Sequence, residues 1–241
     1  MFQLFASENQ FDDNRFYFKE EQYHQLFRVQ RIRVKEALDI VTPTYRYTVE
    51  IAEINNNFIV CKIVEKCVIE KEKVKIILYQ SLPKQDKMAT IIDHTVQSGV
   101  SEIIPVITER SVVKWDQSKK EKHVKRWQEK AYSAACQAKR DHVPVVHPVC
   151  SFDDFLKTVA TSNISNFVAW EEAPQDCLFA KYNKLKNDTV GIFIGPEGGL
   201  SFGEVELLKD HSFQLVSLGK TILRVEIAGL FLIAQLHVGD Y

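Results

Sequence analysis

The sequence lacks the features that would place it outside the ordinary globular classes. Its longest apolar run near the C-terminus, Leu230 to Ala234, is far shorter than the about 20 residues that span a bilayer. Residues 1–9 contain no basic stretch followed by an apolar one, so we expect no secretory signal and no membrane association. Net charge is also nearly absent, because 31 basic side chains face 32 acidic ones, and the balance of −1 gives no overall preference for nucleic acid.

Cysteine is scarce and its pattern is uninformative. The five cysteines are odd in number and none forms a C-x-x-C pair, which argues against a disulfide framework and against a zinc site. A reducing cytoplasm fits this usage best, with most of the thiols buried as small apolar groups. They are Cys61, Cys67, Cys136, Cys150 and Cys177.

Familiar nucleotide and metal motifs are missing too. No G-x-G-x-x-G occurs, and Gly219-Lys220-Thr221 is no P-loop, because Gln214 stands where that loop requires its first glycine. His142 and His147 have no further ligand at a suitable spacing, so we expect no metal site.

What is present is the composition of a folded core. The chain is 45% apolar, 26% charged and 11% aromatic, which excludes disordered, collagen-like and coiled-coil classes. At about 150 residues per domain, the length fits one large domain or two unequal ones.

The N-terminal part is rich in β-branched and aromatic residues. Short runs over 16–18, 45–51 and 58–64 partly alternate, and turn residues separate them, which predicts a small β-rich domain. A charged stretch over 65–75 ends it. We therefore divide the chain into domains of residues 1–72 and 73–241.

Beyond that boundary the pattern changes to strands that alternate with helices, which predicts βαβ units and a mostly parallel sheet. The expected strands cover 74–79, 102–107, 143–149, 166–170, 189–194 and 214–217. The expected helices cover 86–98, 119–139, a segment that begins near 151, 201–210 and 224–236.

The most distinctive local pattern is the turn Gly195-Pro196-Glu197-Gly198-Gly199, which follows a buried strand. Glycine has no Cβ, so the backbone of such a turn can approach a ligand closely. Ser201 and Glu204 have the spacing of a capping box, which predicts that a helix begins directly after the turn. Ligands of open α/β sheets bind beyond the carboxyl ends of strands. The turn is therefore a candidate binding loop, and the alternative is a tight turn with structural glycines.

A second glycine turn, Leu218-Gly219, follows the next expected strand and leads into the last apolar helix. The residues around the start of that helix include Ile222, Leu223, Arg224 and Glu226. Alone, this pattern indicates a helix start with a surface ion pair. Together with the first turn, it indicates two loops that line one pocket.

Positive charge is concentrated despite the neutral average. Between residues 107 and 142 there are ten basic and five acidic side chains, a local balance of +5. A second cluster, Arg28, Arg31, Arg33 and Lys35, falls in an apparent strand whose alternation would put Arg31 and Arg33 on one face. Such patches can follow phosphates, although a solvated helix face would look the same on the longer segment.

Three segments together are similar to one known family. They are residues 82–111, from Leu82-Pro83-Lys84 to Thr108-Glu109-Arg110-Ser111, then the Gly195–Gly199 turn, then Leu218-Gly219 with residues 222–226. The helix from Arg126-Trp127 to Arg140 also matches. Over essentially its whole length the chain resembles the RsmE family, which methylates N3 of a uridine in 16S ribosomal RNA with S-adenosylmethionine.

The resemblance implies an α/β fold of the SPOUT class, with a trefoil-knotted parallel sheet and a small N-terminal PUA-like β-barrel that binds RNA. It also implies that the protein is a homodimer. The expected binding partner of this dimer is 16S ribosomal RNA or the small ribosomal subunit. The residues expected to wrap S-adenosylmethionine are Gly195, Pro196, Glu197, Gly198, Gly199, Leu218, Gly219, Ile222 and Leu223.

Roles for charged residues follow from the chemistry of that reaction. Uridine N3 carries a proton that must leave, so the site needs a base or a cation that stabilises the uridine anion. We expect Arg224 to supply the cation, and Glu226 or water to take the proton. The nucleotide must be splayed out of its stack, and the RNA contacts are expected from Arg28, Arg31, Arg33, Arg110, Gln137 and Arg140.

A second hypothesis is that the chain is a non-catalytic RNA-binding relative that keeps the fold. It is motivated by departures from the family's usual residues at His94, Gln97, Cys136, Thr221 and Ile227. Methylation of a small molecule is disfavoured by the basic clusters and by the separate β-rich domain.

Overall fold

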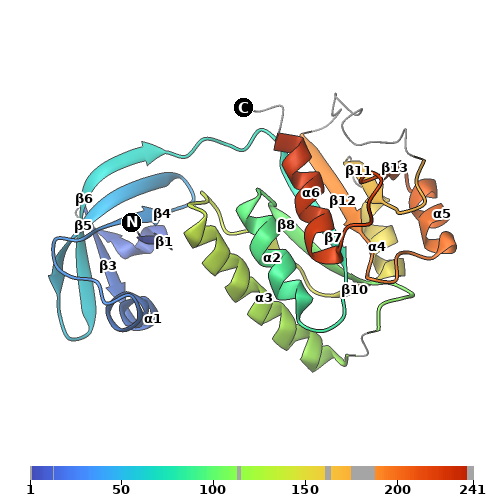
Figure 1. Cartoon of the computed structure of the whole chain (residues 1–241). Helices are drawn as coiled ribbons and strands as arrows, with labels where there is room; N and C mark the ends of the chain where they lie inside the picture. The colour runs from blue at the N-terminus through green and yellow to red at the C-terminus, as the bar shows by residue number, and fades with distance from the viewer. Residues whose placement is uncertain (1, 13, 113–114, 161–163, 175–187, 238–241) are drawn as a thin grey trace. The chain divides into compact units, whose positions relative to one another are not determined.

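The computed structural model describes residues 2–12, 14–112, 115–160, 164–174 and 188–237 (Figure 1). The chain divides into two compact units. One comprises Met1–Lys71 together with Ala135–Val143, and the other comprises Glu72–Ala134 together with Pro144–Tyr241. The first unit thus contains the end of the long basic helix as well as the β-rich segment.

The first unit is built on a six-stranded sheet in the order β1-β4-β5-β6-β3-β2. β1 and β4 are parallel, whereas the other neighbouring strands are antiparallel. The sequence predicted β3, β5 and β6 but not the other three. The strands are β1 (Phe2–Phe5), β2 (Phe11–Asp12), β3 (Arg15–Lys19), β4 (Ala37–Val41), β5 (Tyr45–Ile54) and β6 (Phe58–Val68), and a 3-10 turn, η1 (Glu8–Gln10), precedes β2.

One face of this sheet carries the core of the first unit. Alternate residues of its strands, such as Phe16 and Phe18 of β3 and Val49 and Ile51 of β5, are fully buried in a single cluster. The burial of these apolar surfaces is the main force that holds the sheet together. The alternation that marked these strands in the sequence is therefore the alternation between core and solvent.

The segment that carries Arg28, Arg31 and Arg33 is not a strand, so that prediction was wrong. A short helix, α1 (Glu20–Tyr23), continues into a π-helical turn, η2 (His24–Val29), and an irregular loop follows. The helical spacing of Tyr23, Leu26 and Phe27 places all three against the core, and this apolar face outweighs the alternation of the arginines. Arg31 itself adopts a left-handed backbone conformation with φ of 53°.

The second unit contains a parallel sheet in the order β10-β8-β7-β12-β11-β13, with β9 also paired to β8. Of the predicted strand over 143–149 only Val145–Val146 forms a strand, because Pro148 has no N–H to offer a ladder, and a further short strand follows at Cys150–Ser151. The strands are β7 (Lys75–Ser81), β8 (Glu102–Ile107), β9 (Val145–Val146), β10 (Cys150–Ser151), β11 (Ser165–Ala169), β12 (Thr189–Ile194) and β13 (Gln214–Val216).

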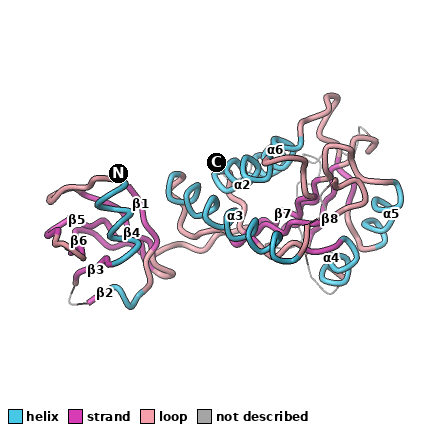
Figure 2. The backbone as a smooth tube through the Cα atoms, turned by 90° about the horizontal axis from the view of Figure 1, so that it is seen from below, coloured by secondary structure: helices cyan, strands magenta, loops and turns pink. Residues whose placement is uncertain are grey.

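Helices cover both faces of this sheet (Figure 2). On one face, Tyr79 and Phe193 join a cluster with the aromatic side chains of α4. On the other face, α6 lies beside α2, and a Cβ at Gly229 of α6 would lie 3.3 Å from Leu78. The helices are α2 (Lys87–Gln97), α3 (Gln117–Gln137), α4 (Phe152–Val159), α5 (Phe202–Asp210) and α6 (Val225–His237).

The alternation of strands and helices in this unit confirms the predicted α/β class with a parallel sheet. A search of the described residues for a helix long and apolar enough to cross a membrane finds none.

Candidate functional site

The Gly195–Gly199 loop leaves the carboxyl end of β12 and is held by the start of α5. The predicted capping box is present: the Ser201 hydroxyl accepts from the backbone N–H of Glu204, whose carboxylate accepts from the N–H of Ser201 at 2.9 Å. The other oxygen of that buried carboxylate accepts from the N–H of Glu109 at 2.8 Å. Glu204 therefore connects the start of α5, directly after the glycine loop, to the segment that follows β8.

Glycine is required at position 199 by the backbone. Gly199 has φ of +70°, a left-handed conformation that side chains disfavour. A Cβ at this position would also collide with the carboxylate of Glu171. The glycine thus allows the loop to turn tightly against the segment that follows β11.

A second loop, residues 217–224, leaves the carboxyl end of β13 and leads into α6. Gly219 has φ of +109°, and its N–H donates to the Ser217 hydroxyl at 3.3 Å. β11 pairs in parallel with both β12 and β13, so the loops after these three strands emerge at the same edge of the sheet.

These loops enclose one cavity of about 650 Å³. The volume falls within the about 300–1,000 Å³ that is usual for small-molecule and cofactor pockets. The third wall is Trp170, Glu171 and Ala173, which follow β11. All of the residues predicted to hold a cofactor or to act on the substrate line this cavity: Gly195, Pro196, Glu197, Gly198, Gly199, Leu218, Gly219, Ile222, Leu223, Arg224 and Glu226.

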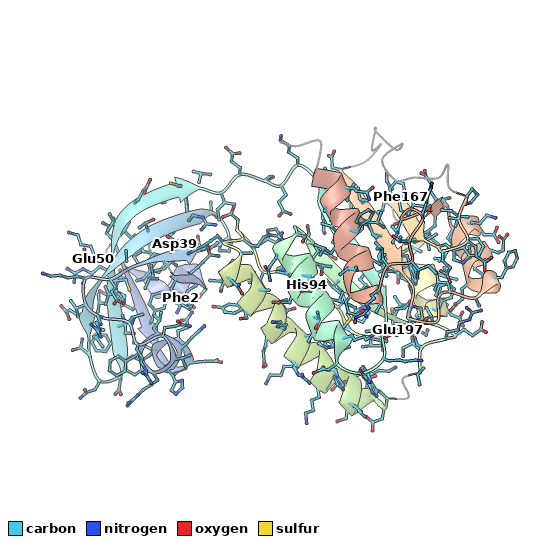
Figure 3. The ribbon with its side chains drawn as sticks, viewed as in Figure 1. Phe2, Asp39, Glu50, His94, Phe167 and Glu197 are labelled. Carbon is cyan, nitrogen blue, oxygen red and sulfur yellow. The ribbon has the colours of Figure 1, made fainter. Side chains whose placement is uncertain are left out.

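Lys87, in the first turn of α2, links the Gly195–Gly199 loop to the first turn of α6 by ion pairs. Its ammonium lies 3.0 Å from Glu197 Oε1 and 3.3 Å from Glu226 Oε1. Glu197, which Figure 3 shows beside the start of α6, also accepts from the backbone N–H of Lys84 at 3.0 and 3.1 Å. One cation therefore holds two carboxylates at the rim of the cavity.

The ion pair between Lys87 and Glu197 shifts the pKa values of both groups in the directions that favour their charged forms. The pKa of Lys87 lies above its ordinary value, chiefly because its ammonium donates to Glu197. Burial opposes ionisation of Glu197, but the Lys84 N–H and the Lys87 ammonium outweigh it, so the pKa of Glu197 lies below its ordinary value.

We expect Lys87→Met to destabilise the protein in a pH-dependent way. Because the pKa of Glu197 is lowered on folding, its ionised form stabilises the fold above the ordinary carboxyl value of 4.5, and this stabilisation is lost as the pH falls through the lower folded value. Thermal unfolding should therefore show a gap between wild type and Lys87→Met at neutral pH that closes in acid.

Lys209→Met is the matched control for that experiment. Lys209 pairs with Glu206 on the surface of α5, where both side chains are exposed, and such pairs contribute little. A gap between wild type and Lys87→Met that persisted unchanged in acid would contradict the ion-pair account.

Glu226 has one buried oxygen without a partner. While Oε1 faces Lys87, Oε2 is one of a few buried side-chain polar atoms, among the described residues, that lack a hydrogen-bond partner. Leaving such an acceptor unsatisfied costs about 1–3 kcal/mol. Glu226 lines the cavity, so a donor on a bound molecule would remove this cost.

The basic residues predicted to bind RNA take different positions. Arg110 donates from a guanidinium N–H to the carbonyl of Gly198 at 2.7 Å, so it holds the glycine loop. Arg224 is exposed at the cavity. Gln137 and Arg140 belong to the first unit, where the carbonyl of Arg140 accepts from Gln3 at 2.8 Å.

Part of the charge on the long basic segment is neutralised within the units. In the first unit, Lys139 lies 2.9 Å from Asp39. In the second, Lys130 of α3 lies 2.9 Å from Asp93 of α2. The +5 balance of the sequence therefore overstates the free positive charge.

Comparison with known proteins agrees with this geometry. Residues 70–237 match the family of RNA methyltransferase domains, and this match covers both cavity loops. The chain belongs to the RNA methyltransferase family. It is 29% identical over 223 residues to ribosomal RNA small subunit methyltransferase E of Bacillus subtilis (strain 168), covering 90% of this chain and 87% of that protein.

Two further relatives of this family carry the same name. The protein of Rickettsia conorii is 27% identical over 217 residues, which cover 89% of this chain and 86% of that one. The crystal structure of the enzyme from Neisseria gonorrhoeae, bound to S-adenosyl methionine, superposes with a TM-score of 0.86 at 25% identity. That superposition covers 98% of this chain and 97% of the other.

The contributors to the cavity that sequence reasoning missed include Lys87, Trp170 and Glu171. A signal for the last two existed, since they directly follow a buried parallel strand, where ligands of open sheets bind. Lys87 carried no such signal, because its place beside the loops depends on how α2 packs beside α6.

Proposed function

We propose that this protein methylates N3 of a uridine in the 16S ribosomal RNA of the small subunit, with S-adenosylmethionine as methyl donor. The observation that carries the proposal is the single cavity that joins both glycine loops to Arg224 and Glu226. Membership of the RNA methyltransferase family supports the reaction class, and the names of the relatives support the RNA.

The residues of the cavity fit the proposed cofactor. The backbone N–H and C=O groups of the two loops can bind the edge of an adenine, and Ile194, Leu200 and Ala228 supply apolar walls. Gly199 and Gly219 allow the close backbone approach that a planar ligand requires. When bound, the cofactor supplies an electrophilic methyl group on a sulfonium.

The protein's own residues would control the proton and the charge on the uridine. Transfer forms the bond from the methyl carbon to N3, breaks the bond from that carbon to sulfur, and releases the N3 proton. Oε2 of Glu226 has no partner and can accept that proton directly or through water. Arg224 is exposed, lines the same cavity and would stabilise the uridine anion.

The finer features of the fold are part of the same proposal. We propose that the segment after β12 forms a trefoil knot, and that the first unit is a PUA-like RNA-binding domain. The domains would divide near residue 72. Both glycine loops follow strands that pair in parallel with β11, an arrangement that fits the knot, and the basic loop after η2 fits RNA binding.

We also propose that the protein is a cytoplasmic homodimer. Ile227 and Phe231 lie one turn apart on α6 and are 40% and 41% exposed, and Ile222 is 89% exposed. A second copy would bury this apolar row. Sedimentation velocity should give twice the monomer mass, and a monomer at micromolar concentration would contradict the dimer.

Calorimetry and a methylation assay together test the proposed function. We expect S-adenosylmethionine to bind the full-length protein, and methyl groups to appear on 16S RNA or on small subunits. Binding of RNA without binding of the cofactor would favour the alternative, a non-catalytic RNA-binding relative.

A further inference from the structure

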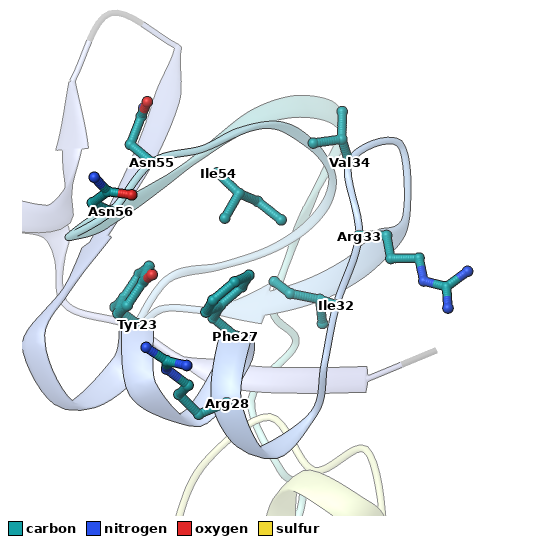
Figure 4. A pocket seen from close by; sticks show the side chains of 9 residues that line it. All are labelled: Tyr23, Phe27, Arg28, Ile32, Arg33, Val34, Ile54, Asn55 and Asn56. Atoms are coloured by element: carbon teal, nitrogen blue, oxygen red, sulfur yellow. The ribbon is translucent and has the colours of Figure 1, made fainter.

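A second cavity lies wholly in the first unit, apart from the cavity proposed for methylation. Its volume is about 660 Å³. Figure 4 shows it between the helical segment that carries Tyr23 and Phe27 and the β5–β6 turn that carries Asn55 and Asn56. We call it the Tyr23–Asn56 pocket.

One wall of the pocket is aromatic. The rings of Tyr23 and Phe27 stack with centroids 5.4 Å apart and planes 25° apart, and both are partly buried against the core. The guanidinium of Arg28 lies 5.5 Å from the Phe27 centroid. Aromatic and guanidinium planes of this kind are the surfaces on which unpaired bases stack.

The opposite wall presents amides. Asn55 and Asn56 are exposed at the β5–β6 turn, which the Asn55 N–H closes by donating to the Phe58 carbonyl at 2.9 Å. A side-chain amide offers both a donor and an acceptor. It can therefore pair with the edge of a base that is held against the aromatic wall.

The rim of the pocket is positive. Residues 28–35 contain four basic and no acidic side chains, and Figure 4 shows Arg33 pointing outward from the cavity. The loop is fixed, since the Lys35 N–H donates to the Ile51 carbonyl at 2.8 Å and the Arg33 N–H to the Glu36 carboxylate at 3.0 Å. Phosphates on either side of a base in the pocket would lie near Arg28 and Arg33, which line it.

We propose that the Tyr23–Asn56 pocket binds one unpaired nucleotide of the RNA substrate. The base stacks on Tyr23 and Phe27, Asn55 or Asn56 pairs with its edge, and Arg28 and Arg33 bind the adjoining phosphates. The inference rests on the proposed function only in taking RNA as the substrate. A paired base hides both faces in its stack, so the pocket selects single-stranded segments.

The test is binding of a short single-stranded RNA to the full-length protein, measured by fluorescence anisotropy. Phe27→Leu keeps an apolar side chain against the core but removes the stacking surface. We expect it to weaken binding about tenfold, because stacking of a base on an aromatic ring contributes about 1–3 kcal/mol. Phe11→Leu, at a partly exposed aromatic on β2 of the same unit, should bind as wild type does.

A matched ligand separates base recognition from charge. The same oligonucleotide with abasic sites keeps its phosphates, so Phe27→Leu should not change its affinity. Arg28→Gln should weaken both ligands and flatten the salt dependence, whereas Arg15→Gln, at an exposed arginine on β3, should not. If Phe27→Leu lowered the affinity for the intact and the abasic oligonucleotide equally, or lowered neither, the proposed role of the pocket would be wrong.

Crosslinking keeps the proposal testable if Phe27→Leu folds poorly. Wild-type protein irradiated with RNA that contains 4-thiouridine should yield crosslinked peptides that include Tyr23 or Phe27, and crosslinks confined to other segments would overturn the pocket. The two proposals fail separately. Crosslinks at Tyr23 without methyl transfer would refute the proposed function alone, and methyl transfer without crosslinks there would refute the pocket alone.

Discussion

Arg224→Ala is expected to lower the rate of methylation about 100-fold at saturating RNA, the size of effect that follows from losing one group that stabilises developing negative charge. Arg224 is exposed and lines the same cavity as Glu226, whose Oε2 is buried and unpartnered. The loss should appear in kcat, because the guanidinium acts on the uridine anion and not on cofactor binding. Single-turnover methylation with labelled S-adenosylmethionine measures it.

The control for Arg224 is a lysine that the site does not use. Lys157→Ala removes an exposed cation on α4 that pairs only with surface groups, so its rate should equal that of wild type. Calorimetry should give Arg224→Ala the wild-type affinity for S-adenosylmethionine. If Arg224→Ala methylates at the wild-type rate, the proposed role of Arg224 is wrong.

The second large effect is expected from Gly199→Ala, which should abolish or strongly weaken cofactor binding. Alanine at φ of +70° costs about 1–2 kcal/mol. Its Cβ would also collide with the Glu171 carboxylate, so the loop must move. A movement that cost 1.4 kcal/mol in binding would already lower affinity about tenfold. Calorimetry with S-adenosylmethionine gives the affinity directly.

Gly203→Ala is the matched control, because the same substitution is made four residues further along. Gly203 lies in α5, and a Cβ there would meet no atom within 4 Å. Alanine is favoured over glycine in a helix by about 0.5–1 kcal/mol. Gly203→Ala should therefore bind the cofactor normally and unfold at an equal or higher temperature. Equal affinities in both variants would contradict the proposed role of the glycine loop.

The sequence predicted the second unit well because its signals are local. Each strand is a short buried run, each helix has its own period, and the capping box at Ser201 and Glu204 fixes where α5 begins. That the two glycine loops line one pocket was predicted because each follows one of two successive strands in the sequence. The shared cavity then follows from parallel pairing of β11 with β12 and β13.

The structure of the first unit was harder to predict because the patterns in its sequence conflict. β1 and β4 are short and bury polar side chains, Gln3 and Asp39, so neither shows a clean alternation. Asp39 is held by Lys139, which lies 100 residues away in sequence. The arginine-rich loop alternates like a strand, but the apolar spacing of Tyr23 and Phe27 decides its conformation. A contact between residues as far apart in sequence as Asp39 and Lys139 leaves no trace in a single sequence.

The partners of the charged residues at the candidate site could not be predicted from the sequence either. Arg110 was predicted to bind RNA from its place in a basic segment, yet its side chain reaches the Gly198 carbonyl. Lys87 carried no motif but connects Glu197 to Glu226. Composition can locate an excess of charge, whereas the partner of each charge depends on tertiary packing.

The most direct test of the proposed function is nucleoside mass spectrometry of 16S ribosomal RNA from cells that lack this protein. We predict that one 3-methyluridine disappears, and that the wild-type gene restores it while Arg224→Ala does not. An unchanged 3-methyluridine content in the deleted strain would contradict the proposed function.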